Sequence, residues 1–433
     1  MFFLILPNQL FDPKYLPKEI TTIYLYEHPQ YFTKYKYNQK RLVLHRASMK
    51  CYFDLLKKKK YDVIYLEYNQ KLPSLEWILF DPIDNLKILK SKYLESPNFL
   101  LTKEQYLEYR RTKSSKFFFN SFYMWGKKQI DIIPNLKSQD KDNRRTPKSQ
   151  LKAPSIPSRS TKSEEKYIQE GITYVKKKFP NNYGTTDGFQ FPISHSSALK
   201  WLKNFLEKKF NQFGDFQDYI QKDDPYLYHS LLSTSINIGL LNPSEIIEMI
   251  RPLKGKISLN SYEGYIRQLF WREYQRFCYI HFKFDGLNYF GNKKKLTKDW
   301  YIGNTGIDPV DDAINMAFKY GYLHHILRLM VIGNWMNLSG ISPKEGFSWF
   351  MEFSCDSYEW VMKQNVLDMV FCVSGGQTMR KPYISSSNYV IKMSDYKKGD
   401  WSDKWDQAYQ KFLKDKKSKL LPRFAYAFAM RYK

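Results

Sequence analysis

The stretch GYLHHILRL, residues 321–329, places His324 and His325 side by side in an apolar run. Arg328 follows them, so on a helix each histidine would lie one turn from the guanidinium. An imidazole can donate or accept a proton near neutral pH, and a buried arginine needs a counter-charge because an unpaired ion is costly inside a protein. Asp356 is the candidate partner for Arg328. A lone histidine in such a run is usually a core residue, but two adjacent histidines beside a buried ion pair favour a functional site.

A second segment, YHSLLSTSINIGLL at 228–241, mixes small hydroxyl side chains with leucines. Ser230 and Ser233 are three residues apart, which would place them on one helical face. Hydroxyls and free backbone N–H groups at the start of a helix suit a pyrophosphate. Mixtures of serine and leucine are also common in ordinary helices, so this segment alone leaves both interpretations open.

A third segment, YIRQLFWREYQRF at 265–277, places amide, indole and guanidinium groups along one predicted helix. Amides and aromatic rings can stack on a base and identify it, while arginines bind phosphates. A solvated amphipathic helix is the alternative. The residues concerned are Gln268, Trp271, Arg272, Gln275 and Arg276.

The elements that must position these residues differ between the two ends of the chain. Short apolar runs alternate with helical spacing through the first 125 or so residues, which predicts a parallel, Rossmann-like sheet covered by helices. The runs FFLILP, TTIYLYE, YDVIYLEY and NFLLT are the expected strands, at 2–7, 21–27, 61–68 and 98–102. The segment 38–59 between the second and third runs has helical spacing.

The later part of the chain has helical periodicity, including an expected long helix near 313–338 that ends at Gly340. Asn242, followed by proline and an acidic first turn, is an expected helix cap. Residues 137–166 are poor in apolar side chains and rich in Lys, Arg, Ser and Pro, which is typical of a tether. We therefore predict an α/β domain at 1–127, an interdomain linker at 128–190 and an all-helical domain at 191–433.

Composition limits the class of protein. The formal charge of +26 favours an anionic partner such as nucleic acid, although an AT-rich genome would also inflate lysine. No run of about 18 apolar residues occurs, and the opening MFFLIL is too short for a signal peptide, so we expect a soluble, intracellular protein of cytoplasm or nucleus. The four cysteines have no CxxC spacing, which favours a reducing compartment and indicates neither disulfides nor a metal site.

Together these segments resemble the photolyase and cryptochrome family. HSLLS followed by glycine is similar to its flavin pyrophosphate loop, with His229 in place of a threonine. RQLFWREY is similar to its substrate-facing helix, WYIGNTGIDPVDDAI…GYLHHILR to its WxxGxTGxPxVDAxM…GWMHNRxR motif, and CDSYEWVM to the segment with its flavin-contacting aspartate. The resemblance covers roughly 190–390 in order, and the N-terminal α/β unit matches the family's antenna domain.

Further motifs narrow the resemblance to the photolyase-related bacterial and viral branch. These are LILPNQLF, HRASMK, GFQFPIS, WVMKQNVLDM and SGGQTMRKPYISSSNYVIKMSDY. Many members of that branch hold an iron–sulfur cluster on four cysteines. Here Lys397, Asp400 and Pro309 stand at ligand positions, so we expect no cluster and expect tryptophan or lysine packing at that end.

The resemblance implies a light-driven repair enzyme that is a monomer, binds FAD as its cofactor and acts on UV-damaged DNA. We expect it to bind no metal ion. Cofactor contacts would be His229, Ser230, Leu231, Leu232, Ser233, Tyr265, Gln268, Arg272, Arg328, Asp356, Tyr358 and Met362. Trp271, Gln275 and Arg276 would contact DNA, and Trp349 and Tyr301 would relay electrons, although Phe350 beside them is a poor relay. A lumazine-type antenna is expected, with Gln9 and Glu27 as contacts at strand ends.

The resemblance also bears on which DNA lesion the enzyme would repair. In the family, a glutamine at Gln268 and a histidine pair accompany (6-4) photoproduct repair, whereas a glutamate and an asparagine accompany cyclobutane-dimer repair. Moving a hydroxyl group between bases requires a proton donor. The resemblance therefore implies a (6-4) photolyase with His325 as acid, His324 in support, and Leu329 where eukaryotic enzymes carry another histidine. A cryptochrome-like photoreceptor, a cyclobutane-dimer photolyase and an inactive DNA-binding flavoprotein remain alternatives.

Overall fold

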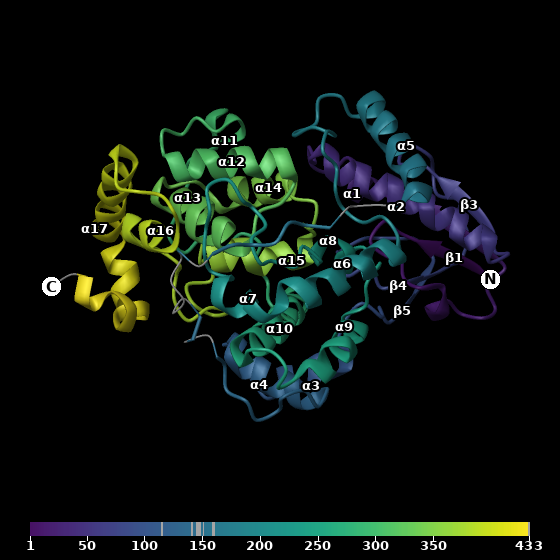
Figure 1. Ribbon diagram of the computed structural model, residues 1–433, viewed down its shortest axis with the longest axis horizontal. Helices are drawn as coiled ribbons and strands as arrows, with labels where there is room; N and C mark the ends of the chain where they lie inside the picture. The colour runs from purple at the N-terminus through teal and green to yellow at the C-terminus, as the bar shows by residue number, and fades with distance from the viewer. Residues whose placement is uncertain (114–115, 140–141, 144–148, 150, 158–160, 432–433) are drawn as a thin grey trace.

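The N-terminal part of the chain is a parallel sheet with helices packed on it (Figure 1). The computed structural model describes residues 1–113, 116–139, 142–143, 149, 151–157 and 161–431. The strands lie in the order β3-β2-β1-β4-β5, and every pair is parallel. This confirms the predicted fold class. The strands are β1 Phe2–Ile5, β2 Thr22–Tyr26, β3 Asp62–Leu66, β4 Trp77–Phe80 and β5 Ser91–Leu94.

One predicted strand was wrong and two strands were not predicted. The run NFLLT forms no strand; its Phe99 and Leu101 are buried in the core instead, and the backbone N–H of Leu101 donates to Glu273 Oε2 at 3.2 Å. The edge strand β5 could not be recognised from an apolar run. Its two central residues, Lys92 and Tyr93, are exposed and need not be apolar. An edge strand that is half solvated has little hydrophobic signature.

Helix α2, Gln39–Lys58, and helix α5, Lys162–Lys178, pack against one another beside the sheet (Figure 1). The helices are in van der Waals contact at Gly171, where a Cβ would lie 3.4 Å from Ala47 Cβ, an ordinary contact distance. Helix α5 was not predicted: it lies within the segment expected to be a linker, part of which falls outside the described residues. The remaining short elements here are η1 Pro13–Tyr15, α1 Pro29–Phe32, α3 Lys103–Arg111 and α4 Phe119–Gln129.

The rest of the chain is helical (Figure 1), and α10 contacts α4, α7, α9, α15 and η5. Buried apolar residues from the sheet and from most of these helices belong to one large hydrophobic cluster, while much of α17 packs in a second, smaller cluster. Asn242 caps α9 as predicted, accepting from the N–H of Ser244 at 2.8 Å. The elements are α6 His195–Lys208, α7 Phe210–Phe216, α8 Ser233–Asn237, α9 Pro243–Ile250, η3 Arg251–Leu253, α10 Leu259–His281, α11 Asp299–Ile302, α12 Asp308–Tyr320, the π-helical η4 Leu327–Gly333, α13 Asn334–Leu338, α14 Pro343–Phe353, α15 Glu359–Met362, the π-helical η5 Lys363–Val370, α16 Ser387–Met393, α17 Asp400–Phe428 and η6 Ala429–Arg431.

The predicted long helix near 313–338 is interrupted. Helix α12 ends at Gly321, which adopts a left-handed φ of 64°, and its carbonyl accepts from the N–H of Cys355 at 2.9 Å. A Cβ on Gly321 would lie 2.6 Å from Cys355 Sγ, so a side chain would not fit. Residues 322–324 belong to no helix or strand, and the chain resumes a helical path at His325. The histidine pair therefore lies at a break between helices.

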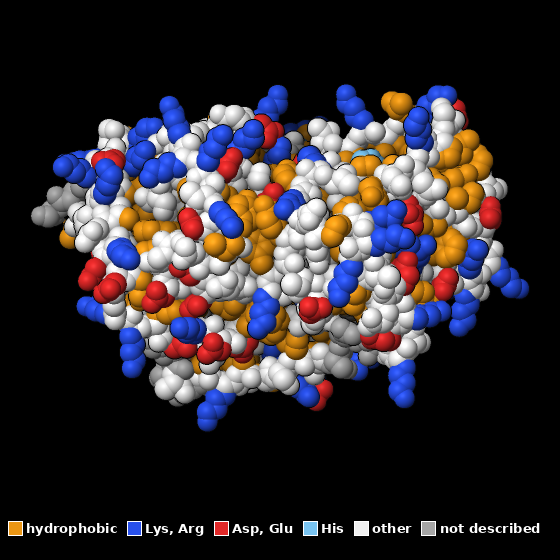
Figure 2. All heavy atoms as spheres, turned by 90° about the horizontal axis from the view of Figure 1, so that it is seen from above, with side chains coloured by type: hydrophobic (Ala, Val, Ile, Leu, Met, Phe, Trp, Pro, Cys, Tyr) orange, Lys and Arg blue, Asp and Glu red, His pale blue; other side chains and the backbone are white. Residues whose placement is uncertain are grey.

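Tryptophan packing at the C-terminal end is confirmed where the resemblance places cluster ligands. The ring of Trp405 lies 5.3 Å from that of Trp335 and 6.2 Å from that of Trp401. Trp401 Nε1 donates to the carbonyl of Lys397 at 3.0 Å. On the face seen in Figure 2, lysine and arginine side chains project among fewer acidic ones. No helix in the described part of the chain is long and apolar enough to cross a membrane.

Candidate functional site

A cavity of about 680 Å³ opens within the helical part of the molecule. Its size suits a cofactor or a large ligand. The walls come from the loop before α8, from α10, from the break after α12, from α15 with η5, and from residues 381–389. Apolar side chains from these elements surround a few polar groups, as in most ligand sites.

The loop before α8 and the first residue of α8 contribute all five residues expected to hold a pyrophosphate, His229, Ser230, Leu231, Leu232 and Ser233. Ser230 and Ser233 do not share a helical face, because the chain is not helical before Ser233 and Leu231 has a positive φ of 59°. The loop instead turns both serines to the cavity. The predicted contacts are thus brought together by a turn and not by a helix.

Arg328 and Asp356 form the predicted ion pair at the cavity wall. Arg328 Nη1 lies 3.0 Å from Asp356 Oδ1, and Nη2 lies 3.2 Å from Oδ2. Ser233 donates to Oδ2 at 2.7 Å, and Ser354 donates to Oδ1. Burial opposes ionisation, but Arg328 and the two serines outweigh it and lower the pKa of Asp356. The carboxylate is therefore charged and fixed in position.

Three histidines meet beside this pair, and their ring nitrogens lie within 4.8 Å of one another. The rings of His229 and His324 are stacked with centroids 4.8 Å apart. Burial lowers the pKa of both well below the usual value, so both are neutral. His324 lies behind the cavity wall, and neither of its ring nitrogens has a hydrogen-bond partner among the described residues.

His325 lines the cavity, and its side chain is 40% exposed. Its Nε2 lies 3.3 Å from Oδ1 of Asp218, a buried residue that sequence analysis did not identify. Nothing in the sequence linked the two, because 107 positions separate them. Asn365, whose amide also lines the cavity, was likewise not predicted.

Helix α10 presents its predicted residues in two different ways. Gln268, Trp271 and Gln275 line the cavity, and Trp271 stacks on Phe119 with centroids 3.7 Å apart. Arg272 also lines it, but Nε donates to Asn237 Oδ1 at 2.9 Å and Nη1 to the carbonyl of Asn98 at 2.7 Å. Burial lowers the pKa of Arg272 to about 10. Arg272 ties α10 to α8 and to the segment that contains Asn98.

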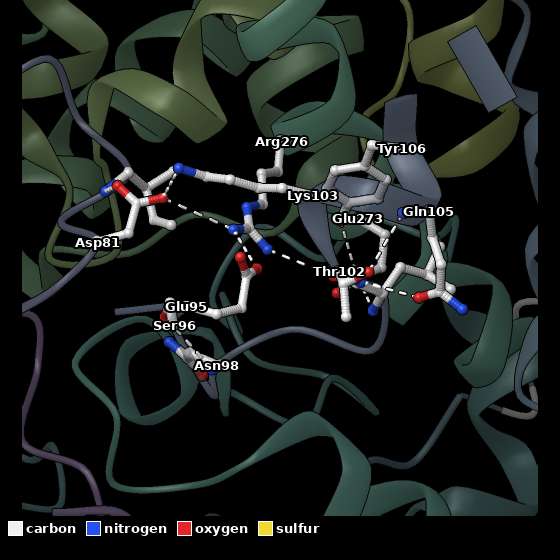
Figure 3. Close-up of polar contacts among 12 residues, drawn as sticks. Asp81, Glu95, Ser96, Asn98, Thr102, Lys103, Gln105, Tyr106, Glu273 and Arg276 are labelled. Carbon is white, nitrogen blue, oxygen red and sulfur yellow. Dashed lines mark hydrogen bonds and ion pairs between the residues drawn. The ribbon is translucent and has the colours of Figure 1, made fainter. Parts of the chain in front are cut away.

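Arg276 was predicted to contact DNA, but the structure buries it inside the protein. Its side chain has no exposed surface, and Nη2 lies 2.9 Å from Glu95 Oε1 and 3.7 Å from Asp81 Oδ2 (Figure 3). Next to it on α10, Glu273 accepts from the hydroxyl of Tyr106 at 2.6 Å. These charges join α10 to the ends of β4 and β5, so they position the helix that lines the cavity.

Tyr265 and Met362 line the cavity as predicted, whereas Tyr358 does not. Tyr358 is completely buried behind α15, where its hydroxyl lies 3.4 Å from His45 Nε2 and its ring faces Arg41. An aromatic residue close to Asp356 in sequence is thus directed into the interface with α2. Trp349 is also completely buried and lies behind the wall, next to the cavity-lining Phe350.

The predicted antenna residues are engaged by the protein itself. Gln9 Nε2 donates to the carbonyl of Phe80 at 2.7 Å, and its Oε1 accepts from Leu6 at 3.2 Å. Glu27 has no exposed surface; it pairs with Arg46 at 2.9 Å and accepts from the hydroxyls of Tyr65 and Tyr174. Glu27 directly follows β2 as predicted, whereas Gln9 lies four residues beyond β1 and bonds to the last residue of β4. The polar side-chain atoms of both are engaged by neighbouring residues of the protein.

Known proteins resemble this chain in both sequence and fold. The family described as deoxyribodipyrimidine photo-lyase-related protein matches residues 3–88 and 75–191. A (6-4) photolyase of Agrobacterium fabrum is 36% identical over 262 residues, which cover 59% of this chain and 51% of that protein. The chain thus spans about half the length of this relative. Uncharacterized protein R853 of Acanthamoeba polyphaga mimivirus is 47% identical over 110 residues, 24% of this chain and 85% of that one.

The fold is similar to that of a bacterial class III photolyase from Agrobacterium tumefaciens. The TM-score is 0.63 at 14% identity, with 96% of this chain and 97% of that chain covered. An archaeal photolyase from Sulfolobus tokodaii, solved with two FAD molecules, gives a TM-score of 0.54 at 12% identity and covers 97% of this chain and 89% of that chain. In sequence the chain is similar to the photolyase-related family and to a (6-4) photolyase, and its fold is that of the solved photolyases; these matches support the photolyase and cryptochrome family.

Proposed function

We propose that this protein is a light-driven DNA repair enzyme, a (6-4) photolyase that acts as a monomer on UV-damaged DNA. The observation that carries the proposal is the position of His325, partly exposed on a cavity that also contains a fixed ion pair and a hydroxyl-bearing loop. Similarity to a (6-4) photolyase over 262 residues supports the lesion type. A lumazine-type antenna and the lack of an iron–sulfur cluster remain predictions from the resemblance.

The residues around the cavity fit FAD. Ser230, Ser233 and the backbone of their loop offer donors for a pyrophosphate, and His229 Nε2 is buried without a hydrogen-bond partner among the described residues. Leucine, isoleucine, valine and methionine side chains supply an apolar wall for flat rings. When bound, FAD would supply light absorption and the transferable electron.

The chain's own residues would then position the lesion and move a proton. A damaged base pair must leave the stack of the duplex to enter a pocket, and this unstacking costs free energy. Stacking on aromatic side chains offsets part of that cost. Trp271, held flat against Phe119, offers such a surface, and the amides of Gln268 and Gln275 can pair with a base edge. His325 would hold the proton that the hydroxyl transfer requires, and Asp218 would orient the ring.

The test is light-driven repair of an oligonucleotide that contains one (6-4) photoproduct. His325→Ala should abolish repair while flavin absorption persists. Repair by the variant at the normal rate would remove His325 from the chemistry.

A further inference from the structure

A ladder of aromatic rings leads from the cavity towards Tyr301. Phe350 lines the cavity, and its centroid lies 5.3 Å from that of Trp349. Phe318 lies 5.7 Å from Trp349 and 5.9 Å from Tyr301. Trp349 Nε1 also donates to the carbonyl of Trp300 at 2.8 Å, one residue before Tyr301. These contacts connect Tyr301 to the cavity through packed rings.

The ladder ends at a tyrosine that is hydrogen-bonded to a carboxyl group. The hydroxyl of Tyr301 donates to Glu352 Oε2 at 3.0 Å, and Glu352 lies on α14 together with Trp349 and Phe350. Burial raises the pKa of Glu352 to about 7, with Glu345 adding to the rise and Tyr301 and Lys36 opposing it.

Tyr183 completes the surroundings of this pair. Its ring stacks on Tyr301 with centroids 4.6 Å apart, and Lys36 Nζ lies 4.6 Å from the Tyr183 centroid. The groups that face Glu352 are therefore two phenols, one lysine and one more distant glutamate. Glu352 is the hydrogen-bonded acceptor of the Tyr301 proton.

Tyrosine and tryptophan differ as electron donors. Loss of one electron makes a phenol strongly acidic, so tyrosine becomes a good donor only where a nearby base takes the proton. Tryptophan can lose an electron and keep its proton for a time. A ladder that ends in tyrosine consequently needs a proton acceptor at the phenol oxygen, and Glu352 occupies that place.

We propose that Glu352 accepts the phenolic proton of Tyr301 and thereby allows Tyr301 to be the terminal electron donor to the cavity. This inference rests on the proposed function, because the oxidant is an oxidised flavin excited by light. One electron would pass from Trp349 to the cavity across Phe350 and be replaced from Tyr301 across Phe318, neither phenylalanine being oxidised. The O–H bond of Tyr301 breaks, and the proton moves to Glu352 Oε2. Tyr301 becomes a neutral phenoxyl radical and Glu352 a neutral acid. A thiol in solution then returns a hydrogen atom to Tyr301, and Glu352 releases its proton to water.

The inference predicts a pH dependence with a defined sign. Only the ionised carboxylate can accept the proton, and its pKa is raised to about 7. The yield of neutral tyrosyl radical after a light flash should be high above this pH and fall as the pH drops through it. Glu352→Gln keeps the shape but removes the base, so radical formation should slow by on the order of 100-fold and lose this pH dependence. Radical formation should also slow in deuterium oxide in the wild type.

Two further variants separate a proton-transfer role from a structural one. Glu345→Gln is the matched control, since Glu345 lies on the same helix but accepts from the N–H of Leu296 and not from Tyr301. It should leave a fast, pH-dependent radical. Tyr301→Trp should make electron donation independent of Glu352, because tryptophan can lose an electron without losing its proton at once. The double variant Tyr301→Trp with Glu352→Gln should therefore reduce the flavin quickly, at a rate that has no pH midpoint.

The experiment is transient absorption with electron paramagnetic resonance on the purified holoprotein. An infrared pH titration should show a carboxylic C=O band that disappears near neutrality and is missing in Glu352→Gln. An equal radical yield and pH profile in Glu352→Gln would overturn the inference. So would a photoactive wild type without a tyrosyl radical. Repair after chemical reduction of the flavin bypasses the ladder, so Glu352→Gln should then repair normally; loss of that repair in the wild type would instead contradict the proposed function.

Discussion

Nε2 of His325 lies 3.3 Å from Oδ1 of Asp218 at the wall of the cavity. The histidine side chain is 40% exposed, whereas that of the aspartate is 8% exposed. A buried carboxylate that holds one ring nitrogen orients an imidazole and selects its tautomer. His229 and His324, by contrast, are buried and neutral. Among these three histidines, His325 is thus the one placed to exchange a proton with a bound base.

Replacing His325 by alanine should lower (6-4) repair by on the order of 100-fold or more, the usual contribution of a general acid. The flavin spectrum and the affinity for damaged DNA should change little, because the ion pair and the loop remain. His281→Ala, at the last residue of α10, is the matched control and should repair normally. Repair per absorbed photon is the measurement. Equal loss in both variants would point to misfolding.

Asp356→Asn should destabilise the protein by about 3–5 kcal/mol at neutral pH, because it leaves the guanidinium of Arg328 buried without its counter-charge. The pKa of Asp356 is lowered in the folded protein, so its contribution is present above the unfolded value of about 3.9 and is lost as the pH falls through the folded value. Urea unfolding at several pH values measures both effects. A difference from wild type that does not shrink in acid would contradict the assignment.

Gly321→Ala should destabilise the break that presents the histidine pair. Alanine at a left-handed φ costs about 1–2 kcal/mol, and the new Cβ would meet Cys355 Sγ at 2.6 Å. Gly188→Ala is the matched control, with a φ of 63° and no atom within 4 Å of its Cβ. Thermal unfolding should show a larger loss at Gly321, and Cys355→Ala should recover part of it. Equal losses at the two glycines would exclude the clash.

Lys381 and Arg276 should respond differently in DNA binding. Lys381 is exposed and lines the cavity, so Lys381→Ala should reduce the slope of log affinity against log salt by about 0.9 if it contacts one phosphate of duplex DNA. Arg276→Gln should leave that slope unchanged and lower stability, since Arg276 is buried against Glu95. A changed salt slope in Arg276→Gln would show that Arg276 contacts DNA.

Several features of the fold and of the site followed from the sequence for physical reasons. Continuous apolar runs predicted buried parallel strands, and three of them form β1, β2 and β3. A buried arginine requires a carboxylate as its counter-charge, and Arg328 pairs with Asp356. Residues His229 to Ser233 line the cavity, although as a loop that leads into α8 and not along one helix.

Other features depend on contacts between distant segments, which spacing does not reveal. Arg276 was expected to contact DNA, but it is buried against Glu95 and Asp81, which lie more than 180 positions earlier in the chain. A single glycine such as Gly321 is compatible with a helical sequence pattern, so the helix was expected to continue through it. In the structure the helix ends there, and the carbonyl of Gly321 accepts from the N–H of Cys355. The pairing of His325 with Asp218 arises in the same way.

The most direct test of the account is repair by the wild-type protein, with its flavin reduced, of two oligonucleotides under blue light. One would contain a single (6-4) photoproduct and the other a single cyclobutane dimer. The account predicts restoration of the (6-4) lesion and little or no restoration of the dimer. Restoration of the dimer alone, or of neither lesion by a yellow protein that bleaches in light, would contradict it.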